Sequence, residues 1–281
     1  MKKQIDLKDV EDQLYQAIGR VGIEIDPAVK RKLTEALAQE KNTLAQDILS
    51  DLLLNGQVAH KLQKPLCQDT GLAVFFVEIG YDLHLPASLE KTINSAVARA
   101  YQDFYFRKSM VNDPLFHRIN TSNNLPAIIH WSFNQGDKLK ISFSAKGGGS
   151  ENMSRLKMLK PSDGVQGVKD FVLKTVIEAN GNPCPPIIVG IGVGGNFESC
   201  AILAKKALFR DLDDNHPEEE WAALEQDILQ EINKTNIGPQ GLGGDTSALA
   251  VKIEYLPCHI ASLPLAVNIQ CHSHRHFTLE F

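Results

Sequence analysis

The 281-residue sequence predicts a mixed α/β domain of the α+β class, folded as one lobe or two, with a helical N-terminal cap. Three observations predict this fold. Apolar residues keep helical spacing over the first 58 residues or so, short apolar runs of strand length follow, and further helical patterns then alternate with further strands. No repeat, linker or low-complexity segment divides the chain, so we expect one domain over residues 1–281.

The N-terminal region, residues 5–58, is predicted to be helical. Its apolar side chains recur every three or four positions, as in Val10, Leu14 and Ile18. Gly56 is expected to end this region because glycine is common just past a helix C-terminus. With 43% hydrophobic residues, the chain can bury a sizeable core beneath such helices.

The rest of the chain alternates strands and helices. Short β-branched and aromatic runs predict the strands, and longer amphipathic stretches predict the helices. The expected elements are a strand at 73–77, a helix at 89–106 closed by Arg107 and Lys108, a strand pair at 128–133 and 139–145 joined through 134–137, a helix at 165–179, a strand at 187–191, helices at 197–209 and 217–233, and strands at 249–255 and 263–270.

The net charge and the N-terminal residues limit which partners and which location we expect. A net charge of −5 gives no reason to expect binding to nucleic acid or to an anionic membrane surface. The N-terminal residues form no apolar signal region, and no stretch approaches the length of a membrane span. We therefore expect a cytoplasmic protein.

Three of the five cysteines indicate a metal centre. Cys67, Cys184 and Cys271 lie far apart in sequence, and each sits beside turn-forming or polar residues, so a fold could converge them. Three thiolates suggest an iron–sulfur cluster with one iron left open, whereas an electron carrier normally uses four cysteines. Asp69 adds a carboxyl group two residues after Cys67. This combination is the equipment of a Lewis-acid hydro-lyase.

Simpler interpretations remain open for several of these residues. Asp69 could be an Asx-turn residue that bonds the backbone of Gly71. Cys184 could be a small apolar side chain under a loop. Cys200 shares a helical face with apolar residues and is expected to be a buried thiol, and Cys258 is assigned to packing as well.

Glycine-rich and histidine-rich segments add candidates. The loops 146–150 and 238–246 can wrap closely around a ligand, or they can be flexible connections. A G-x-G-x-x-G pattern at 190–195 resembles a dinucleotide fingerprint, but no second strand follows the next helix to present an acid, so we assign these glycines to close packing. The alternating His272, His274 and His276 are expected on a solvated or partner-facing edge, and His259 is the better site histidine.

The motifs together resemble the class I, iron–sulfur fumarate hydratases, and more narrowly the alpha subunit of the two-subunit form, a group with L-tartrate dehydratase alpha subunits as sisters. The resemblance runs from about residue 10 to the C-terminus. It rests on the segments Cys67-Gln68-Asp69-Thr70-Gly71, Lys146-Gly147-Gly148-Gly149-Ser150-Glu151-Asn152, Cys184-Pro185-Pro186, Gly238-Pro239-Gln240-Gly241 and Ala266-Val267-Asn268-Ile269-Gln270-Cys271.

The resemblance implies specific roles. It implies a [4Fe–4S] cluster held by Cys67, Cys184 and Cys271. Five further positions match the family's substrate-site residues, with Asp69 and His259 as the acid and base candidates; they are Gln68, Asp69, Arg107, Gly148 and His259.

The resemblance also implies a substrate and partners. The expected reaction interconverts fumarate and (S)-malate, with a tartrate dehydratase alpha subunit as the alternative; the run 149–154 looks more like the fumarases. Single-chain members continue into a further domain, whereas this sequence stops at Phe281, so we expect a separate beta subunit and a higher oligomer of alpha–beta pairs. An NAD-dependent oxidoreductase and a redox-sensing module are the rival hypotheses.

Overall fold

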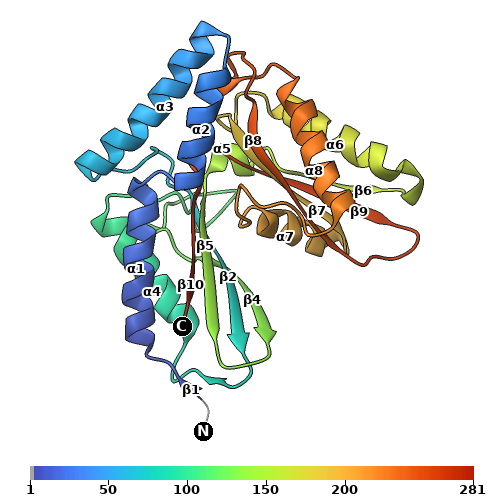
Figure 1. Ribbon diagram of the computed structural model, residues 1–281. Coiled ribbons are helices and arrows are strands. Elements are labelled where there is room, and N and C mark those ends of the chain that lie inside the picture. Colours follow the sequence, from blue (N-terminus) through green and yellow to red (C-terminus); the bar gives the residue numbers. More distant parts are fainter. Residues whose placement is uncertain (1–2) are drawn as a thin grey trace. The chain divides into compact units, whose positions relative to one another are not determined.

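A computed structural model describes residues 3–281, which form two compact units, each with its own sheet and core (Figure 1). Unit 1 comprises the described part of Met1–Asp26 together with Asn55–Gly148 and His274–Phe281. Unit 2 comprises Pro27–Leu54 and Gly149–Ser273. The mixed α/β class and the helical N-terminal region are as predicted.

Unit 1 is a four-stranded mixed sheet with two helices on one face. The strand order is β10-β5-β2-β4, with β2 antiparallel to β5 and parallel to β4. The elements of unit 1 are β1 (Lys3–Gln4), α1 (Leu7–Ile23), the part of α3 (Thr43–Leu62) from Asn55, β2 (Leu72–Gly80), β3 (Leu83–His84), α4 (Leu89–Asp103), β4 (Ile128–Asn134), β5 (Leu139–Lys146) and β10 (Arg275–Glu280). Strands β1 and β3 form a separate parallel pair.

The core of unit 1 forms where α1 and α4 pack against the sheet. Leu14 of α1 and Ile93 of α4 are fully buried in one cluster with Phe75 of β2 and Phe143 of β5, whose ring centroids are 5.0 Å apart. Strand residues alternate sides, so every second residue of β2 faces these helices. Burial of this surface is the main driving force that holds the helices on the sheet.

The predicted pairing between the strands at 128–133 and 139–145 is wrong. Strands β4 and β5 both exist, but they do not form a hairpin, because β2 lies between them and pairs with each. One face of β2 is buried throughout and the other is partly buried, which fits a strand that has a neighbour on each side. Helix α4 also ends at Asp103 rather than at residue 106, so Arg107 does not close it.

Helix α3 (Thr43–Leu62) corrects the prediction at Gly56, because it runs on for six residues beyond this glycine. A Cβ atom at Gly56 would lie 3.0 Å from Cγ2 of Ile25. Glycine therefore serves close packing here and does not terminate the helix.

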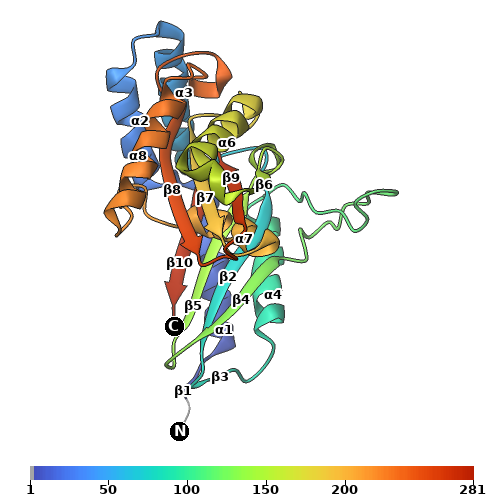
Figure 2. The same ribbon diagram turned by 90° about the vertical axis from the view of Figure 1, so that its right-hand side faces the viewer.

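A long irregular segment connects α4 to β4 and extends away from both (Figure 2). Its base is fixed by Asn124, whose Oδ1 accepts hydrogen bonds from the backbone N–H of Ser109 and Met110 (2.7 and 3.3 Å). Leu115 and Phe116 near its tip are 71% and 82% exposed.

Unit 2 contains the second four-stranded sheet, of order β6-β9-β7-β8, with β7 and β8 parallel and β9 antiparallel to its neighbours. Its elements are α2 (Pro27–Gln39), α3 as far as Leu54, α5 (Gly148–Glu151, from Gly149), β6 (Arg155–Leu159), the 3-10 turn η1 (Pro161–Asp163), α6 (Gly164–Ala179), β7 (Ile187–Gly194), α7 (Phe197–Ala207), α8 (Glu219–Asn233), η2 (Pro239–Gly241), β8 (Ala248–Leu256) and β9 (Leu263–Gln270).

Helices cover both faces of the unit 2 sheet. Val172 of α6 and Ile232 of α8 share a buried cluster with Val189 and Ile191 of β7. Cys200 and other residues of α7 form a separate cluster that includes Ala266 of β9. Because alternate residues of a strand face opposite sides, β7 is buried on both faces.

A buried ionic network supports α8 and β8. The Glu225 carboxylate is 1% exposed and accepts hydrogen bonds from Arg210 Nη1 (2.6 Å) and from the backbone N–H of Ile253 (2.7 Å). Arg210 also pairs with Asp214, which in turn contacts Lys252 Nζ at 2.7 Å. Such a network is costly to break, because the partner left behind stays buried without compensation.

The G-x-G-x-x-G glycines serve close packing, as predicted. A Cβ atom at Gly190 would lie 2.2 Å from the carbonyl oxygen of Ala204, and one at Gly192 would lie 2.1 Å from that of Cys200. Helix α7 therefore lies directly on the backbone of β7. Gly195 adopts φ +66°, where a side chain would also meet Ser199.

We expect Gly192→Ala to destabilise the protein by about 3 kcal/mol, because the added methyl group must push α7 off β7. Urea unfolding of the variant measures the loss. Ala201→Ser, on the exposed side of α7, is the control and should change stability little. An unchanged unfolding midpoint in Gly192→Ala would contradict the packing role of this glycine.

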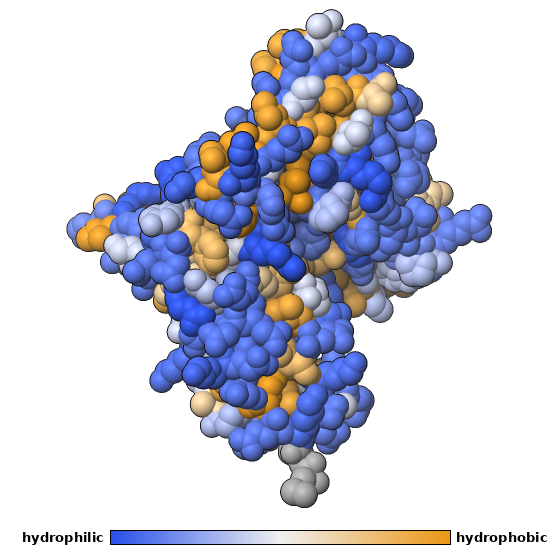
Figure 3. All heavy atoms as spheres, turned by 60° about the vertical axis from the view of Figure 1, so that its left-hand side comes forward, coloured by the Kyte–Doolittle hydropathy of each residue, from blue (hydrophilic) through white to orange (hydrophobic). Residues whose placement is uncertain are grey.

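Within residues 3–281, no helix is long and apolar enough to cross a membrane. Apolar side chains do gather on parts of the surface, as the face drawn in Figure 3 shows among mainly hydrophilic residues. On α3, for instance, Leu44, Leu54 and Leu62 are each more than half exposed.

Candidate active site

The Cys67–Gly71 turn leads directly into β2 of unit 1. Leu66 anchors its start, because its N–H donates to Gly22 O (2.9 Å) and its carbonyl accepts from Asn55 Nδ2 (2.8 Å). Gly71 adopts φ +89°, and a Cβ atom there would lie 2.4 Å from the carbonyl carbon of Lys146. Only glycine fits this approach, so the turn is held tightly against the end of β5.

Asp69 links two of the sequence motifs. Its Oδ2 accepts a hydrogen bond from the backbone N–H of Gly148 (2.7 Å), which lies 79 residues away. The carboxylate thus reaches the glycine-rich loop instead of closing an Asx turn with Gly71. Asp69 is half-buried and Gly148 is exposed, so the pair lies at the surface of unit 1.

The glycines of the 146–150 loop allow close approach. A Cβ atom at Gly147 would be 3.3 Å from Asp69 Oδ2, and one at Gly149 would be 2.9 Å from the carbonyl oxygen of Asn182. Neither glycine adopts a positive φ. The requirement for glycine here is therefore space for neighbouring loops, and α5 begins within the segment.

Arg107 is brought to the same turn by its backbone. Its N–H donates to Thr70 Oγ1 (3.2 Å), while the side chain is exposed. Tyr101 Oη and Asn124 Nδ2 both donate to Gly71 O, at 2.9 and 3.2 Å. The structure therefore groups Asp69, Gly148 and Arg107, three of the predicted residues.

Cys67 and Gln68 occupy the outer part of the turn. Cys67 is half-buried, Gln68 is exposed, and the thiol lies 3.4 Å from Gln68 Oε1 in a weak hydrogen bond. Neither side chain belongs to the apolar cluster of unit 1. This position fits a thiolate ligand better than a packing residue.

Two cysteine loops meet in unit 2. Cys184 is exposed with φ 56°, and its carbonyl oxygen accepts from His272 Nδ1 (2.9 Å), the residue after Cys271. Cys271 is half-buried just past the end of β9. Gln240 supports the Cys184 loop, because both its backbone N–H and its Nε2 donate to Pro185 O (2.8 and 2.9 Å).

The second glycine-rich loop therefore has a structural role. A Cβ atom at Gly241 would lie 2.4 Å from Gly181 Cα, so this loop packs against the Cys184 turn. Both glycine-rich loops are thus explained by close contact with a neighbouring loop.

The donor set of these loops fits an iron–sulfur cluster. Cys67, Cys184 and Cys271 all lie in loops and none is fully buried, and thiolates are the soft ligands that such a cluster uses. Among residues 3–281, no group of three or more His, Cys, Asp or Glu side chains forms a site for a single metal ion.

The structure separates His259 from the unit 2 cysteines. Strand β7 begins near Cys184 and runs parallel to β8, which ends shortly before His259, while β9 runs back to Cys271. His259 therefore lies at the opposite end of this sheet from both cysteines. It is exposed, and its Nδ1 accepts from Ala261 N–H (3.1 Å).

The remaining cysteines differ from each other. Cys200 is fully buried as predicted, its thiol donates to Phe197 O (3.4 Å), and burial raises the pKa of the thiol. Cys258 was expected to pack but is exposed, with its thiol 3.3 Å from Ser262 O. It lies in the loop between β8 and β9.

The expectation of a solvated or partner-facing edge at His272, His274 and His276 is wrong for His274 as a solvated residue, while His272 and His276 are half-buried. His274 is 3% exposed, and its ring centroid lies 3.9 Å from that of His276 with the two rings tilted by 34°. Arg275 between them is 1% exposed. His274 directly precedes β10, which begins at Arg275, includes His276 and pairs with β5, whereas His272 belongs to unit 2.

Sequence reasoning missed the residues that brace the motifs. Arg275 Nη1 donates to Asp69 O (3.0 Å). Glu151 pairs with Lys205 Nζ (2.5 Å) and accepts from Asn268 Nδ2 (3.3 Å). Ser150 Oγ donates to Gln270 Oε1 (3.3 Å). The polar Asn and Gln within the otherwise apolar strand β9 were the available signal.

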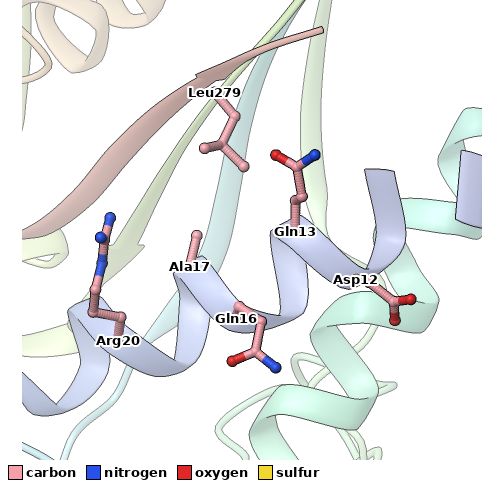
Figure 4. Close-up of a pocket in the computed structure, with 6 residues that line it drawn as sticks. All are labelled: Asp12, Gln13, Gln16, Ala17, Arg20 and Leu279. Atoms are coloured by element: carbon pink, nitrogen blue, oxygen red, sulfur yellow. The ribbon is translucent and has the colours of Figure 1, made fainter. Parts of the chain in front are cut away.

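One surface cavity of about 430 Å³ lies elsewhere in unit 1, between α1 and β10 (Figure 4). None of the predicted site residues lines it, and Leu279 places it at the end of β10 away from Arg275. Its lining residues are Asp12, Gln13, Gln16, Ala17, Arg20 and Leu279.

Unit 1 thus holds Asp69, Gly148 and Arg107 at the turn that follows Cys67, and unit 2 holds Cys184 and Cys271 in adjoining loops. Thiols, a carboxylate and a guanidinium are the kinds of group that metal-assisted acid–base catalysis uses. Residues 11–280 match the family model "Fumarate hydratase (Fumerase)", and the chain belongs to this family, the class I fumarate hydratases.

Curated relatives have tartrate in their names. The chain is 40% identical over 272 residues to a Methanocaldococcus jannaschii protein named "Putative L(+)-tartrate dehydratase subunit alpha", covering 95% of each chain. It is 33% identical over 253 residues to the L(+)-tartrate dehydratase subunit alpha of Escherichia coli, covering 89% of this chain and 83% of that one. The corresponding Shigella sonnei protein is also 33% identical, over 252 residues.

Proposed function

We propose that this chain is the alpha subunit of a hydro-lyase that removes water from a 2-hydroxydicarboxylate. L(+)-tartrate is the first candidate substrate, and the (S)-malate–fumarate pair is the second. The observation that carries the proposal is the contact of Asp69 with Gly148, beside the Arg107 segment, because it joins three motifs of the family into one surface. Membership of the family supports the reaction class.

Cys67, Cys184 and Cys271 are the proposed ligands of a [4Fe–4S] cluster. Their loop positions support this role. When bound, a cluster with one iron open to substrate supplies a Lewis acid for the hydroxyl group that leaves. The two cysteines of unit 2 are held in adjoining loops by the contact of His272 with Cys184.

The residues of unit 1 have distinct proposed roles. Asp69 transfers a proton, since its carboxylate is half-buried, oriented by Gly148 N–H and reachable from solvent. Arg107 provides an exposed guanidinium for a substrate carboxylate. Gln68, beside Cys67, and Gly148 contribute polar contacts to the substrate. His259 as a second acid–base group stays a prediction from the family resemblance.

The choice between substrates follows the relatives. The sequence of the run 149–154 favours fumarate, whereas the curated relatives have tartrate dehydratase names. The structure explains part of that run differently, because Ser150 and Glu151 are bound to Gln270, Asn268 and Lys205. Residues used for internal bracing carry little information about substrate, so we place tartrate first.

The assay that tests the function uses the two-chain complex, reconstituted anaerobically with iron and sulfide. We expect dehydration of at least one of L(+)-tartrate and (S)-malate, with the D(−)-tartrate and (R)-malate enantiomers as controls. Turnover of neither substrate by a cluster-loaded complex would contradict the proposal. Nicotinamide binding by a colourless protein would instead favour the oxidoreductase hypothesis.

We also propose that a beta subunit completes the site, as the subunit names of the relatives suggest. A dicarboxylate brings two negative charges, and cations must compensate both when the site closes. Arg107 is exposed and can bind one of them, but Arg275, the second arginine near Asp69, is 1% exposed and cannot. A cation from a partner chain would compensate the other carboxylate.

This chain alone should be nearly inactive after anaerobic reconstitution. We expect dehydration to appear on addition of the beta chain, with a higher oligomer of alpha–beta pairs detected by light scattering. Turnover of the isolated chain equal to that of the complex would disprove the shared site without affecting the proposed reaction.

A further inference from the structure

Arg275 is a charged side chain in a buried position. It is 1% exposed and one of the largest fully buried side chains among residues 3–281. A guanidinium stays charged at any pH that a protein tolerates, so burial is costly unless hydrogen-bond acceptors and opposite charge surround it. Arginine is retained at such a position only when its donors are used.

The guanidinium of Arg275 donates to the Asp69 turn. Arg275 Nη1 donates to the main-chain carbonyl oxygen of Asp69 (3.0 Å). Nη2 lies 3.9 Å from the position that a Cβ atom would take on Gly147. The guanidinium therefore lies between the Asp69 turn and the glycine-rich loop, where Gly148 N–H binds the Asp69 carboxylate.

The strand register fixes Arg275 at this end of the sheet. Arg275 opens β10 opposite Ala145 of β5, and Leu72 opens β2 opposite Lys146. The start of β10, the end of β5 and the start of β2 thus lie together, and the Asp69 turn precedes β2 directly.

Arg275 and Asp69 also act on one buried phenol. Burial raises the pKa of Tyr101, the charge of Arg275 lowers it, and that of Asp69 raises it. Tyr101 in turn holds Gly71 O at 2.9 Å. Both ends of the Asp69–Gly71 segment are therefore fixed from the protein interior.

We propose that Arg275 is a positioning residue for Asp69: it holds the backbone of the Asp69 turn from beneath while Gly148 aims the carboxylate outward. This role rests on the proposed function of Asp69. Being buried, Arg275 does not contact the substrate. It acts by keeping the proton-transfer group within the narrow range of geometry that turnover needs.

Two substitutions test the role. Arg275→Lys keeps the charge but replaces the planar fork with a single point donor, and Arg275→Met removes the donors. We expect each to lower kcat by roughly 10- to 100-fold, the usual effect of losing a supporting contact. KM should change less than about threefold, because Arg275 does not bind substrate. Iron and sulfide content should equal those of the wild type.

The matched control is Arg210→Lys in unit 2. Arg210 is a largely buried arginine in an ionic network, and its contacts with Glu225, Asp214 and the carbonyl oxygen of Ile253 involve no predicted site residue. The Arg210→Lys substitution should lower the melting temperature without lowering kcat. The control separates loss of positioning from loss of stability.

A second measurement is independent of the reaction. Hydrogen–deuterium exchange of the cluster-free protein should show backbone amides of residues 67–71 exchanging at least about tenfold faster in Arg275→Lys than in the wild type and Arg210→Lys. If Arg275→Met does not fold, Arg275→Lys decides. Unchanged exchange, or a kcat within twofold of wild type in a fully loaded variant, would show that Arg275 only packs. An inactive wild type with faster exchange in Arg275→Lys would instead refute the proposed function alone.

Discussion

Each of the single substitutions Cys67→Ser, Cys184→Ser and Cys271→Ser should abolish cluster retention and reduce dehydration to the level of the cluster-free protein. A serine hydroxyl keeps the size of the thiol but is a poor ligand for iron, and three protein ligands leave none to spare. All three side chains lie in loops where they do not fill the cores, so folding should survive the change. Iron and sulfide analysis after anaerobic reconstitution measures the effect.

Two cysteines serve as matched controls. Cys258→Ser changes an exposed loop thiol like that of Cys184, and Cys200→Ser changes a buried one. Both should keep the cluster, and Cys200→Ser should only lose stability because it buries a hydroxyl group within α7 packing. Loss of iron in Cys200→Ser together with a full cluster in Cys184→Ser would overturn the ligand assignment.

Asp69→Asn should keep the cluster and lose dehydration activity by roughly 10²- to 10⁴-fold, the usual contribution of a general acid or base. The amide oxygen can still accept the hydrogen bond from Gly148 N–H, so the turn keeps its shape. What disappears is the ability to exchange a proton. Steady-state rates at saturating substrate, normalised to cluster content, measure the loss.

The control for this variant is Asp163→Asn. Asp163 is an exposed carboxylate that also accepts a backbone N–H, that of Lys160, at 2.9 Å, but it lies outside the predicted site. Its substitution should leave kcat unchanged. Normal turnover of a cluster-loaded Asp69→Asn protein would reduce Asp69 to a turn residue.

The elements of this fold were predictable where the signal is local. Amphipathic spacing located α1, α6 and α8, and apolar runs located β2 and β7. The order of the strands was not predictable in this way, because β2 separates β4 from β5 and the pairing joins residues far apart in sequence. The hairpin expected at 134–137 rested on turn residues alone, which fit other connections equally well.

The candidate site likewise contains residues that local motifs predict and residues that only strand pairing places. Motifs singled out Asp69, Gly148 and Arg107, and the structure groups these three. Arg275 escaped notice because a single arginine among alternating histidines carries no pattern, and its burial follows from the pairing of β10 with β5. The distance of His259 from the unit 2 cysteines depends on strand direction, which no local pattern shows.

The most direct test of the central claim, a hydro-lyase whose cluster takes part in the reaction, is a Mössbauer spectrum of the reconstituted two-chain complex. It is recorded with and without L(+)-tartrate or (S)-malate. We expect about a quarter of the iron signal, one site of a [4Fe–4S] cluster, to change on adding the substrate that turns over, because three irons are held by cysteine and one is open. A spectrum that stays unchanged in a complex that dehydrates the substrate would contradict the claim.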